Sequence, residues 1–337
     1  MGALNDARWM AAALALAERG RGLTAPNPNV GCVIVSDGRV VGRGWTQAGG
    51  RPHAEAMALG EAGEAAREAT AYVTLEPCAH EGGRGPACAP ALAEAGLARV
   101  VIGIGDPDPR TDGEGIAHLE RAGVAVTRNV LAAQARRSMA GFLTRRALGR
   151  PHVTLKLAAS LDGRIALASG ESRWITGPEA RAHAHLERAR HEAILVGRGT
   201  LAADSPSLDV RLPGLEARSP RRVVLTSAGA PDGWMAIAAP DDVAALESVD
   251  HLLVEGGAKT AAGFLAADLV DRLLLYRAPI LIGEGIAALG DIGLASLDAA
   301  HGRWRLADAR ALGSNRLDVY ERARASSGKV DTTFPPG

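Results

Sequence analysis

One histidine, one glutamate and two cysteines stand at spacings that suit a catalytic metal site. Pro52-His53-Ala54-Glu55 is followed by Glu76-Pro77-Cys78, and Cys88 comes ten residues after Cys78. One imidazole and two thiolates are good zinc ligands, and three protein ligands leave a fourth position open for water. Glu55 lies two residues beyond His53, where a carboxylate can take a proton from that water and hand it to a leaving amine. The spacing therefore predicts a zinc-dependent enzyme that removes an amino group by hydrolysis.

Each of these residues alone has an ordinary structural interpretation. A single histidine is often a core or surface residue, and a single cysteine is often a small buried hydrophobe. A closed structural zinc site is the alternative for the whole group, with His80 as its fourth ligand. Proline before both His53 and Cys78, and helical patterns after His53 and Cys88, favour the open catalytic site.

The elements that would position these residues alternate between strand and helix patterns. Two apolar runs flank Asp37-Gly38, which is a strong signal for a two-stranded hairpin. The expected helices are 5–18, 53–67, 90–95 and 131–148, and the expected strands are 30–35, 40–45, 71–75, 100–104 and 124–127. This alternation is typical of a layered α/β domain, and Gly149-Arg150-Pro151 marks its end. We expect domains at 1–148 and 151–324.

The second half restarts the alternation. A capping box at Thr176-Gly177-Pro178-Glu179 predicts a helix over 178–190. The expected strands are 152–157, 193–196, 223–226, 251–254 and 273–276, with a final hairpin near 304–306 and 316–320. We expect the polar tail 325–337 to be disordered.

Two glycine turns follow strands in this half, at Gly197-Arg198-Gly199-Thr200 and at 255–260. Backbone amides at such a turn and at a helix N terminus bind phosphate groups. Glycine that merely permits tight packing is the alternative at both. Neither turn is a Rossmann fingerprint, so a nicotinamide cofactor would be bound by another fold.

Composition excludes several function classes. The 337 residues contain 38 Lys+Arg and 38 Asp+Glu with no polybasic run, which argues against a nucleic-acid partner. Three cysteines, two of them in the metal pattern, form no disulfide framework and indicate a reducing compartment. No apolar run has membrane length, so we expect no membrane partner and a cytoplasmic location.

With these motifs in hand, the sequence resembles the bifunctional deaminase–reductase family of riboflavin biosynthesis over about residues 6–320. The matching motifs are Pro-Asn-Pro-Asn-Val-Gly (26–31), Pro-His-Ala-Glu (52–55), Tyr-Val-Thr-Leu-Glu-Pro-Cys-Ala-His (72–80), Lys-Leu-Ala-Ala-Ser-Leu-Asp-Gly (156–163), Ser-Gly-Glu-Ser-Arg-Trp-Ile-Thr (169–176) and Val-Glu-Gly-Gly (254–257). The resemblance implies a cytidine-deaminase-like three-layer α/β/α domain followed by a dihydrofolate-reductase-like α/β domain.

The resemblance also implies two successive reactions on one phosphoribosylated pyrimidine. The first domain, with one zinc ion per chain, would remove the 2-amino group of 2,5-diamino-6-(5-phosphoribosylamino)pyrimidin-4(3H)-one by hydrolysis. The second would use NADPH to reduce the ribosyl group to ribityl, giving 5-amino-6-(5-phosphoribitylamino)uracil. Relatives suggest a dimer or tetramer.

Carried over residue by residue, the resemblance implies the roles of individual side chains. His53, Cys78 and Cys88 would bind zinc, and Glu55 would be the catalytic proton shuttle. Asn27, His80 and Arg84 would bind the deaminase substrate. The NADPH-binding positions would be Ala158, Trp174, Thr200, Asp204, Ser227, Gly257, Ala258, Lys259, Thr260, Ala261, Ala262 and Gly263. The positions that bind the reductase substrate would be Ser172, Arg188, Leu208, Arg211 and Glu255. Lys156 is either a functional residue or a charge at a strand edge.

Two other functions compete with this one. A nucleic-acid base deaminase with an unrelated second domain would share the zinc pattern but should show a basic surface. A regulatory module that binds NADPH without reducing a substrate would share the cofactor positions.

Overall fold

The structure is a computed structural model that describes residues 3–79 and 85–324. Within these residues the chain forms two compact units, one that extends to Leu148 and one that starts at Gly149. None of the described helices combines the length and the apolar character that crossing a bilayer requires.

The first unit is built on a five-stranded sheet with the order β2-β1-β3-β4-β5. Its strands are β1 (Gly31–Ser36), β2 (Arg39–Trp45), β3 (Thr70–Leu75), β4 (Arg99–Ile104) and β5 (Ala125–Thr127). The predicted hairpin joins β1 and β2, and both residues of its turn, Asp37 and Gly38, have positive φ, as a two-residue hairpin turn requires. β3 pairs antiparallel with β1 and parallel with β4, so β3 and β4 end at the same edge.

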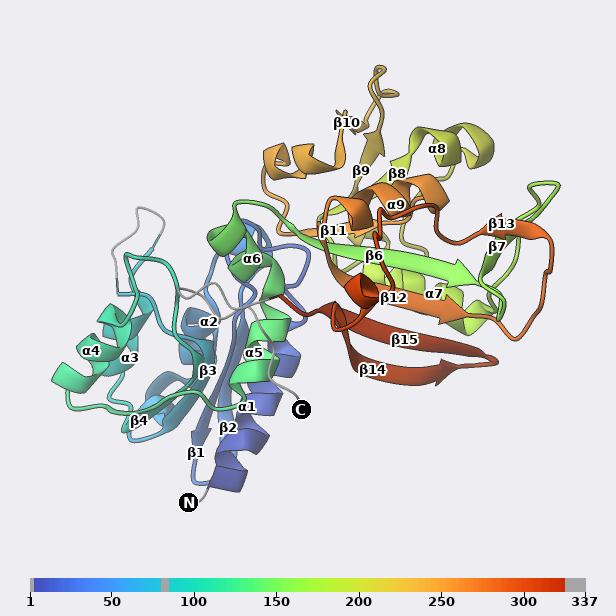
Figure 1. Cartoon of the computed structure of the whole chain (residues 1–337). Coiled ribbons are helices and arrows are strands. Elements are labelled where there is room, and N and C mark those ends of the chain that lie inside the picture. The colour runs from blue at the N-terminus through green and yellow to red at the C-terminus, as the bar shows by residue number, and fades with distance from the viewer. Residues whose placement is uncertain (1–2, 80–84, 325–337) are drawn as a thin grey trace. The chain divides into compact units, whose positions relative to one another are not determined.

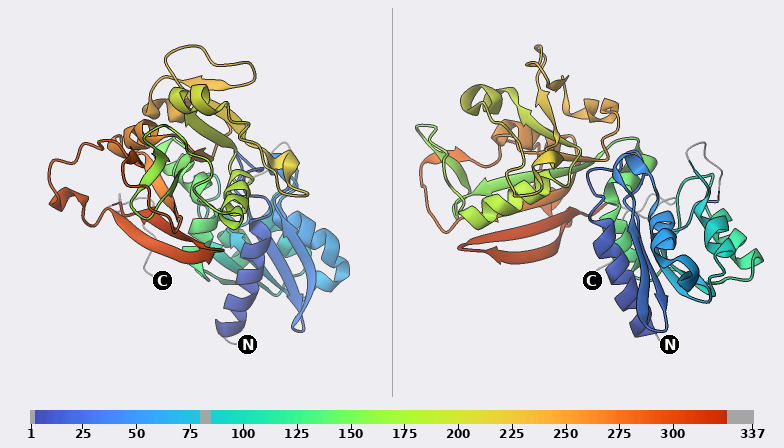
Figure 2. Two further views of the ribbon diagram at one scale, coloured as in Figure 1. Left: turned by 90° about the vertical axis from the view of Figure 1, so that its right-hand side faces the viewer. Right: turned by 180° about the vertical axis from the view of Figure 1, so that it is seen from behind.

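Helices cover both faces of this sheet (Figures 1 and 2). They are α1 (Ala3–Ala17), α2 (Ala54–Ala62), α3 (Cys88–Glu94), α4 (Glu114–Arg121), α5 (Ala132–Ser138) and α6 (Ala140–Leu148), with the short 3-10 helices η1 (Ala48–Gly50) and η2 (Gly63–Ala66). Met10 and Ala13 of α1 pack against Val33 on one face, whereas Ala58 of α2 packs in the cluster around Ile34 on the other. This is the three-layer α/β/α arrangement that the sequence predicts.

Two helix predictions for the first unit need correction. The closing helix expected over 131–148 is two helices, because Met139 departs from helical geometry between α5 and α6. The helix expected over 53–67 begins after His53 and ends at Ala62, with η2 following it. Gly63 has positive φ, which stops the α-helix there.

The second unit is built on an eight-stranded sheet with the order β10-β9-β8-β11-β6-β12-β15-β14. Its strands are β6 (His152–Ala159), β8 (Ala193–Gly197), β9 (Arg221–Leu225), β10 (Met235–Ile237), β11 (His251–Val254), β12 (Val270–Arg277), β14 (Trp304–Leu312) and β15 (Asn315–Arg322). The strands from β10 to β12 in this order run parallel to one another. β15 pairs antiparallel with β12, and β14 pairs antiparallel with β15, so β14 runs in the same direction as β12. β7 (Arg164–Leu167) and β13 (Gly285–Ala287) form a separate two-stranded sheet.

Helices again lie on both faces of the large sheet. They are α7 (Pro178–Arg188), α8 (Arg198–Asp204) and α9 (Ala258–Ala266), with the 3-10 helices η3 (Glu216–Arg218), η4 (Pro240–Ala245) and η5 (Asp298–Ala300). Phe264 of α9 packs in the cluster around Leu155 on one face, whereas Ala180 of α7 packs near Tyr276 on the other. The expected capping box at α7 is wrong: Gly177 is the residue before the helix, and its N–H donates to Asn315 Oδ1 at 2.7 Å.

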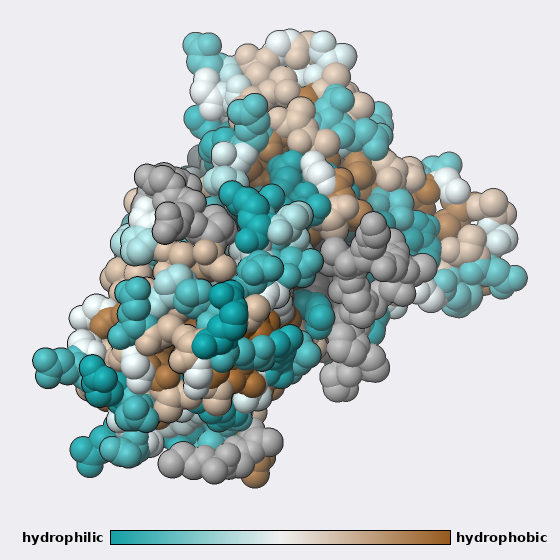
Figure 3. All heavy atoms as spheres, turned by 90° about the vertical axis from the view of Figure 1, so that its left-hand side faces the viewer, coloured by the Kyte–Doolittle hydropathy of each residue, from teal (hydrophilic) through white to brown (hydrophobic). Residues whose placement is uncertain are grey.

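The surface is mixed in polarity where Figure 3 shows it. On that face, hydrophobic residues are interspersed among hydrophilic ones. The apolar residues instead concentrate inside each unit, in the clusters on the two faces of its sheet.

Candidate active sites

Three elements of the first unit bring the metal-binding candidates together. His53 directly precedes α2, Cys78 follows the carboxyl end of β3, and Cys88 is the first residue of α3. β3 is buried along almost its whole length, so Cys78 emerges from the middle of the sheet into the space between the starts of two helices. The two helix starts supply the remaining ligands.

The distances among these side chains suit zinc. His53 Nδ1 lies 3.3 Å from Cys88 Sγ and 3.7 Å from Cys78 Sγ. Zinc bonds of about 2.0–2.1 Å to nitrogen and about 2.3 Å to sulfur in a tetrahedral site place N and S atoms about 3.6 Å apart. Among the described residues, this is the one group of three His, Cys, Asp or Glu side chains whose ligand atoms lie close enough to share an ion, within 4.8 Å of one another.

The two thiols interact with each other as well as with His53. A hydrogen bond from Cys88, with a further one from His53, lowers the pKa of the Cys78 thiol to about 4. The neighbouring Cys78 in turn raises the pKa of Cys88. Cys88 N–H also donates to Cys78 Sγ at 3.4 Å, and Ala89 N–H donates to the Cys78 carbonyl at 3.0 Å. The start of α3 therefore holds Cys78 in place from two directions.

Glu55 lies in the first turn of α2 with only 4% of its surface exposed. Burial raises the pKa of this carboxyl to about 7, although the neighbouring His53 acts in the opposite direction. A carboxyl group with a pKa near the working pH both accepts and releases a proton readily.

Glu76, in the motif before Cys78, is a structural residue. Its buried carboxylate accepts the N–H groups of Gly115 at 3.0 Å and Ile116 at 3.2 Å, at the start of α4. It also accepts the N–H groups of Gly113 at 3.2 Å and Asp106 at 3.4 Å. An anion is favourable at a helix N terminus, so Glu76 ties the end of β3 to α4 and to the loop after β4.

A cavity of about 240 Å³ adjoins these residues and includes Asn27, His53, Glu55 and Cys78 in its lining. Asn27 Nδ2 donates to the Gly50 carbonyl at 3.0 Å, which fixes the amide at the cavity wall. The structure thus places Asn27 in the same cavity as the metal-binding residues. The other two predicted substrate contacts, His80 and Arg84, lie outside the described residues.

The same cavity is lined by charged residues that the sequence analysis did not assign. They are Arg51, Asp106, Asp108, Arg110 and Arg146. The sequence analysis assigned no role to the loop that contains Asp106, yet this loop follows the carboxyl end of β4, which is parallel to β3. Parallel strands end at the same edge of a sheet, so residues that follow β4 lie near residues that follow β3. The position of Asp106 and Asp108 directly after a strand could therefore have predicted that they lie near Cys78.

In the second unit, the strand order reverses between β8 and β11. After β8 the chain continues to β9 on one side, whereas after β11 it passes through α9 to β12, beyond β6. Ligands of open α/β sheets bind outside the carboxyl ends of the strands at such a point. Gly257 N–H, at the start of α9, donates to Thr200 Oγ1 of α8 at 3.2 Å across this point.

The residues predicted for the cofactor gather at this edge of the sheet. Ala158 lies near the end of β6, Thr200 and Asp204 lie in α8 after β8, and Ser227 follows β9. Gly257 precedes α9, and 258–263 form its first turns, with Thr260, Ala261 and Ala262 buried. A helix start of this kind suits a cofactor phosphate, so the residues present fit NADPH.

Close packing explains two of the glycines in the predicted phosphate-binding turns. A Cβ at Gly197 would lie 2.1 Å from Thr260 Oγ1, and a Cβ at Gly256 would lie 2.5 Å from Thr260 Cβ. At Gly199, by contrast, an added Cβ would meet no atom within 4 Å. The packing interpretation is therefore correct for Gly197 and Gly256.

A second cavity, of about 250 Å³, brings predicted cofactor and substrate residues together. Its lining includes Lys156, Ala158, Ser172, Trp174, Arg188, Asp204 and Arg211. The other predicted residues are not in its lining: Thr200, Leu208, Ser227, Glu255 and 257–263. Leu208 packs its side chain in the core with Ile194 and Val196, and Ser227 is exposed beyond β9.

Glu255 and its cationic neighbours form a buried ionic group beside this cavity. Arg188 donates from Nε and Nη2 to the two Glu255 oxygens at 2.8 and 3.0 Å, and Lys156 Nζ lies 3.7 Å from the carboxylate. Burial alone would raise the pKa of Glu255, but Lys156 and Arg188 together lower it to about 2. Glu255 is therefore ionised, and it orients Arg188 and Lys156 at the cavity wall.

Comparison with known proteins assigns both units. Residues 4–104 match the family described as the cytidine and deoxycytidylate deaminase zinc-binding region, and residues 151–317 match the RibD C-terminal domain. Riboflavin biosynthesis protein RibD of Escherichia coli is 41% identical over 334 residues, covering 85% of this chain and 91% of the relative. The chain belongs to the RibD family. RibD of Haemophilus influenzae is 39% identical, and the match covers 94% of this chain and 97% of that relative.

Solved structures of RibD proteins agree with this assignment. Acinetobacter baumannii RibD, form 1, has a TM-score of 0.83 at 36% identity, with 96% of this chain and all of that chain covered. The Thermotoga maritima deaminase/reductase has a TM-score of 0.85 at 31% identity, with 95% and 99% covered.

Family membership confirms the main predictions of the sequence. The chain has a cytidine-deaminase-like N-terminal domain and a dihydrofolate-reductase-like C-terminal domain, and it is a bifunctional deaminase and reductase of riboflavin biosynthesis. Its cofactors are zinc and NADPH. The alternative of a nucleic-acid base deaminase with an unrelated second domain is wrong, because the second domain is that of RibD.

Proposed function

We propose that the domain over residues 1–148 removes the 2-amino group of 2,5-diamino-6-(5-phosphoribosylamino)pyrimidin-4(3H)-one by hydrolysis. The observation that carries this assignment is the convergence of His53, Cys78, Cys88 and buried Glu55. The printed name of the Thermotoga maritima relative, a diaminohydroxyphosphoribosylaminopyrimidine deaminase/5-amino-6-(5-phosphoribosylamino)uracil reductase, supports the choice of substrate.

In the proposed deamination, His53, Cys78 and Cys88 would hold one zinc ion, which would supply a polarised water at neutral pH when bound. Glu55 accepts a proton from the attacking water and returns it to the amino nitrogen, which leaves as ammonia while the ring carbon keeps the oxygen. Asn27 holds the pyrimidine ring at the cavity wall, and His80 and Arg84 are the further substrate contacts that we propose from the sequence.

The domain over residues 151–324 then reduces the ribosyl group to ribityl, giving 5-amino-6-(5-phosphoribitylamino)uracil. NADPH, when bound, would supply a hydride for C1′ of the opened ribose, while the nitrogen attached to C1′ takes up a proton. The chain positions the cofactor through Ala158, Trp174, Thr200, Asp204, Ser227 and 257–263. Ser172, Arg188, Arg211 and Glu255 position the substrate, with Lys156 beside them. Leu208, whose side chain packs in the core, would take part only through its backbone.

Arg188 and Arg211 are the proposed contacts of the substrate phosphate in this second site. Both line the cavity, and a guanidinium group matches the geometry of phosphate oxygens. Arg188→Ala and Arg211→Ala should each weaken binding of the reductase substrate. If both variants kept the affinity of the unchanged protein, the assignment of this cavity would be wrong.

The proposed order of reactions is tested directly with purified, zinc-loaded protein. The diaminopyrimidinone substrate is added, and ammonia release and NADPH oxidation are followed together. We expect ammonia first and NADPH oxidation after it. Ammonia without NADPH oxidation would overturn the substrate assigned to the second domain, and the absence of both would overturn the substrate assigned to the first.

We further propose that the protein works as a homo-oligomer in the cytoplasm. The strand pair β7–β13 and its surroundings expose large apolar side chains, among them Leu281, Ile286 and Leu297, which a second copy could cover. All three cysteines carry free thiols, which suits a reducing compartment. Light scattering of the purified protein should show a mass of two or four chains; a single-chain mass would contradict the oligomer.

A further inference from the structure

The cavity of the deaminase domain has a cationic part that the roles above leave unexplained. Arg51, Arg110 and Arg146 line it together with His53 and Glu55. The three arginines come from three segments: Arg51 lies just before the metal-binding motif, Arg110 in the loop after β4, and Arg146 in α6. These segments are distant in the sequence, so their guanidinium groups meet at one cavity only in the folded chain.

Asp108 holds two of these arginines in place. Arg110 donates from Nε to Asp108 Oδ1 at 2.9 Å and from Nη2 to Oδ2 at 2.6 Å. Arg146 Nη2 donates to the same Oδ2 at 3.1 Å, and its guanidinium lies over the Phe142 ring at 5.4 Å. The Asp108 side chain is only 7% exposed, whereas Arg110 and Arg146 are 62% and 42% exposed. The buried carboxylate thus fixes two guanidinium groups whose outer faces remain accessible.

Three further carboxylates line the cavity. Glu76 accepts backbone N–H groups at the start of α4, and Glu55 lies against the metal-binding residues. Asp106 accepts the Asp108 N–H at 2.9 Å and is buried in the wall. Asp108 is therefore the carboxylate of the cavity that hydrogen-bonds directly to Arg110 and Arg146.

We propose that Arg51, Arg110 and Arg146 form the subsite that binds the phosphate group of the deaminase substrate, with Asp108 as the positioning residue for Arg110 and Arg146. This inference rests on the proposed deamination of a phosphorylated pyrimidine riboside. Such a substrate carries its amino group on the ring and its phosphate at the far end of the ribose, so it needs a cationic contact away from the zinc ligands. Guanidinium groups held at fixed positions bind phosphate oxygens by charge-assisted hydrogen bonds.

The test compares deamination of the phosphorylated substrate with that of its dephosphorylated riboside. In the double variant Arg110→Gln/Arg146→Gln, we expect KM for the phosphorylated compound to rise on the order of tenfold to a hundredfold, as for the loss of hydrogen bonds to a charged group. We expect kcat, and KM for the riboside, to stay within about twofold, because neither arginine touches the reacting ring. Deamination of the riboside by the same variant serves as the internal check that the deaminase domain is folded.

Two further variants separate phosphate binding from a structural role. Arg110→Lys/Arg146→Lys keeps both charges and should recover part of the affinity for the phosphorylated compound. Arg121→Gln removes an exposed arginine of α4 that bonds only within its own helix, at the Ala117 carbonyl, and should change neither KM. Added salt should raise KM for the phosphorylated compound with the unchanged protein and have little effect with the Gln double variant.

The outcomes distinguish this inference from the proposed function on which it rests. If the unchanged protein deaminates neither compound, the proposed function fails. If it prefers the phosphorylated compound and the Gln double variant keeps that preference, the deamination stands and the arginine subsite is wrong. If the Gln double variant loses activity on both compounds to the same extent, the arginines act on the fold of the domain and the subsite is also wrong.

Discussion

Glu55 is the side chain on which we propose that the first reaction depends most directly, because no other described carboxylate lies buried against His53 and Cys78. Its position comes from α2, whose first turn places it beside the metal-binding residues, and burial shields its carboxyl group from bulk solvent. The amide of glutamine has nearly the same shape as the carboxyl group but cannot carry a proton between two atoms.

Glu55→Gln should therefore bind zinc normally and lose deamination by about 10²–10⁴-fold. Metal analysis should still find one zinc per chain, and reduction of the separately supplied deaminated intermediate should be unchanged. Glu61→Gln is the matched control, because Glu61 lies on the same helix but is exposed and paired with Arg43. Retained ammonia release in Glu55→Gln would remove the residue from the mechanism.

Among the elements, the contact of α9 with the end of β8 can be tested atom by atom. An added Cβ at Gly197 would lie 2.1 Å from Thr260 Oγ1 but 3.5 Å from Thr260 Cβ, and 3.5 Å is an ordinary contact. At Gly256 the nearest atom is Thr260 Cβ itself, at 2.5 Å. Removing the Thr260 hydroxyl should therefore relieve the steric clash of a Cβ at Gly197 and leave the clash of a Cβ at Gly256.

Gly197→Ala should lower the free energy of unfolding of the second domain by about 1–3 kcal/mol, the usual cost of overpacking. Adding Thr260→Ala should restore most of this loss. Gly256→Ala is the matched control, since it should remain destabilised in the presence of Thr260→Ala. A double-mutant cycle by urea unfolding measures both couplings; equal rescue of the two glycine variants would contradict the geometry.

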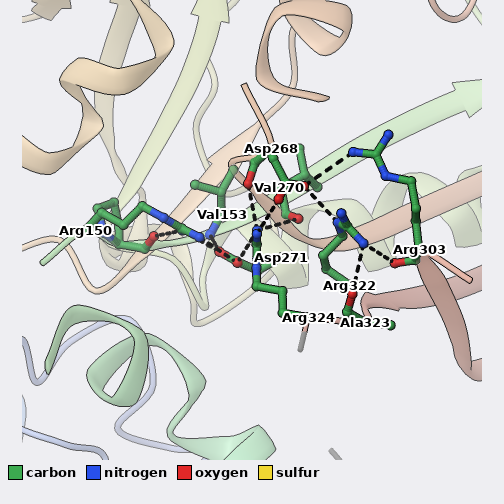
Figure 4. A network of polar contacts seen from close by, with 10 residues as sticks. Arg150, Val153, Asp268, Val270, Asp271, Arg303, Arg322, Ala323 and Arg324 are labelled. Atoms are coloured by element: carbon green, nitrogen blue, oxygen red, sulfur yellow. Dashed lines mark hydrogen bonds and ion pairs between the residues drawn. The ribbon is translucent and has the colours of Figure 1, made fainter. Parts of the chain in front are cut away.

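The two ends of the second unit meet at Asp268, in the loop after α9, and at Asp271, near the start of β12 (Figure 4). Arg150, just before β6, donates to both Asp271 oxygens at 2.7 and 2.8 Å, and Arg324, after β15, donates to Asp271 at 3.1 Å and to Asp268 at 2.7 Å. Arg322 also donates to Asp268, at 2.8 Å. Arg150 and Asp271 are only 10% and 11% exposed, so removing one partner leaves the other poorly solvated.

Asp271→Asn should destabilise the second domain by about 2–3 kcal/mol at neutral pH, or roughly 5–10 °C in Tm. Burial alone would raise the pKa of Asp271, but Arg150 and His152 hold it below its usual value. A carboxyl group whose pKa is lower in the folded than in the unfolded state stabilises the fold at pH values above its unfolded-state pKa of about 3.9. This stabilisation is lost as the pH falls through the folded-state pKa.

The difference in Tm between the unchanged protein and Asp271→Asn should therefore be largest near neutral pH and narrow below about pH 4. Exposed Asp232, replaced by Asn, is the control and should change Tm little at any pH. A Tm difference for Asp271→Asn that does not change with pH would show that the charge of Asp271 contributes little.

At the scale of the whole molecule, each candidate cavity is lined by residues of one unit alone. Glu55→Gln should then abolish the first reaction without touching the second, and Arg188→Ala should impair the second without touching the first. An equal mixture of the two variant proteins should convert the starting pyrimidine to the ribityl product, because the intermediate passes between molecules. Accumulation of the deaminated intermediate in the mixture would show that the two sites must lie in one chain.

The sequence alone determined the chemistry of this protein. His53, Glu55, Cys78 and Cys88 stand in short motifs whose residue types specify zinc and a proton shuttle, and hydrophobic alternation was enough to predict most strands within a few residues. The longer motifs led to the family for the same reason, because a motif of consecutive residues is visible without any knowledge of the fold.

Only the tertiary structure decided which distant residues meet. Asp108 and Arg146 are 38 residues apart, and Arg150 and Asp271 are 121 apart. The break at Met139, the packing of Thr260 against two glycines, and the arginines of the deaminase cavity are likewise decided by neighbours from other segments. Local sequence patterns indicate which backbone conformation a segment prefers and which of its side chains are buried. Ion pairs and close packing depend on the paths of several segments at once, so they can be identified only in the folded chain.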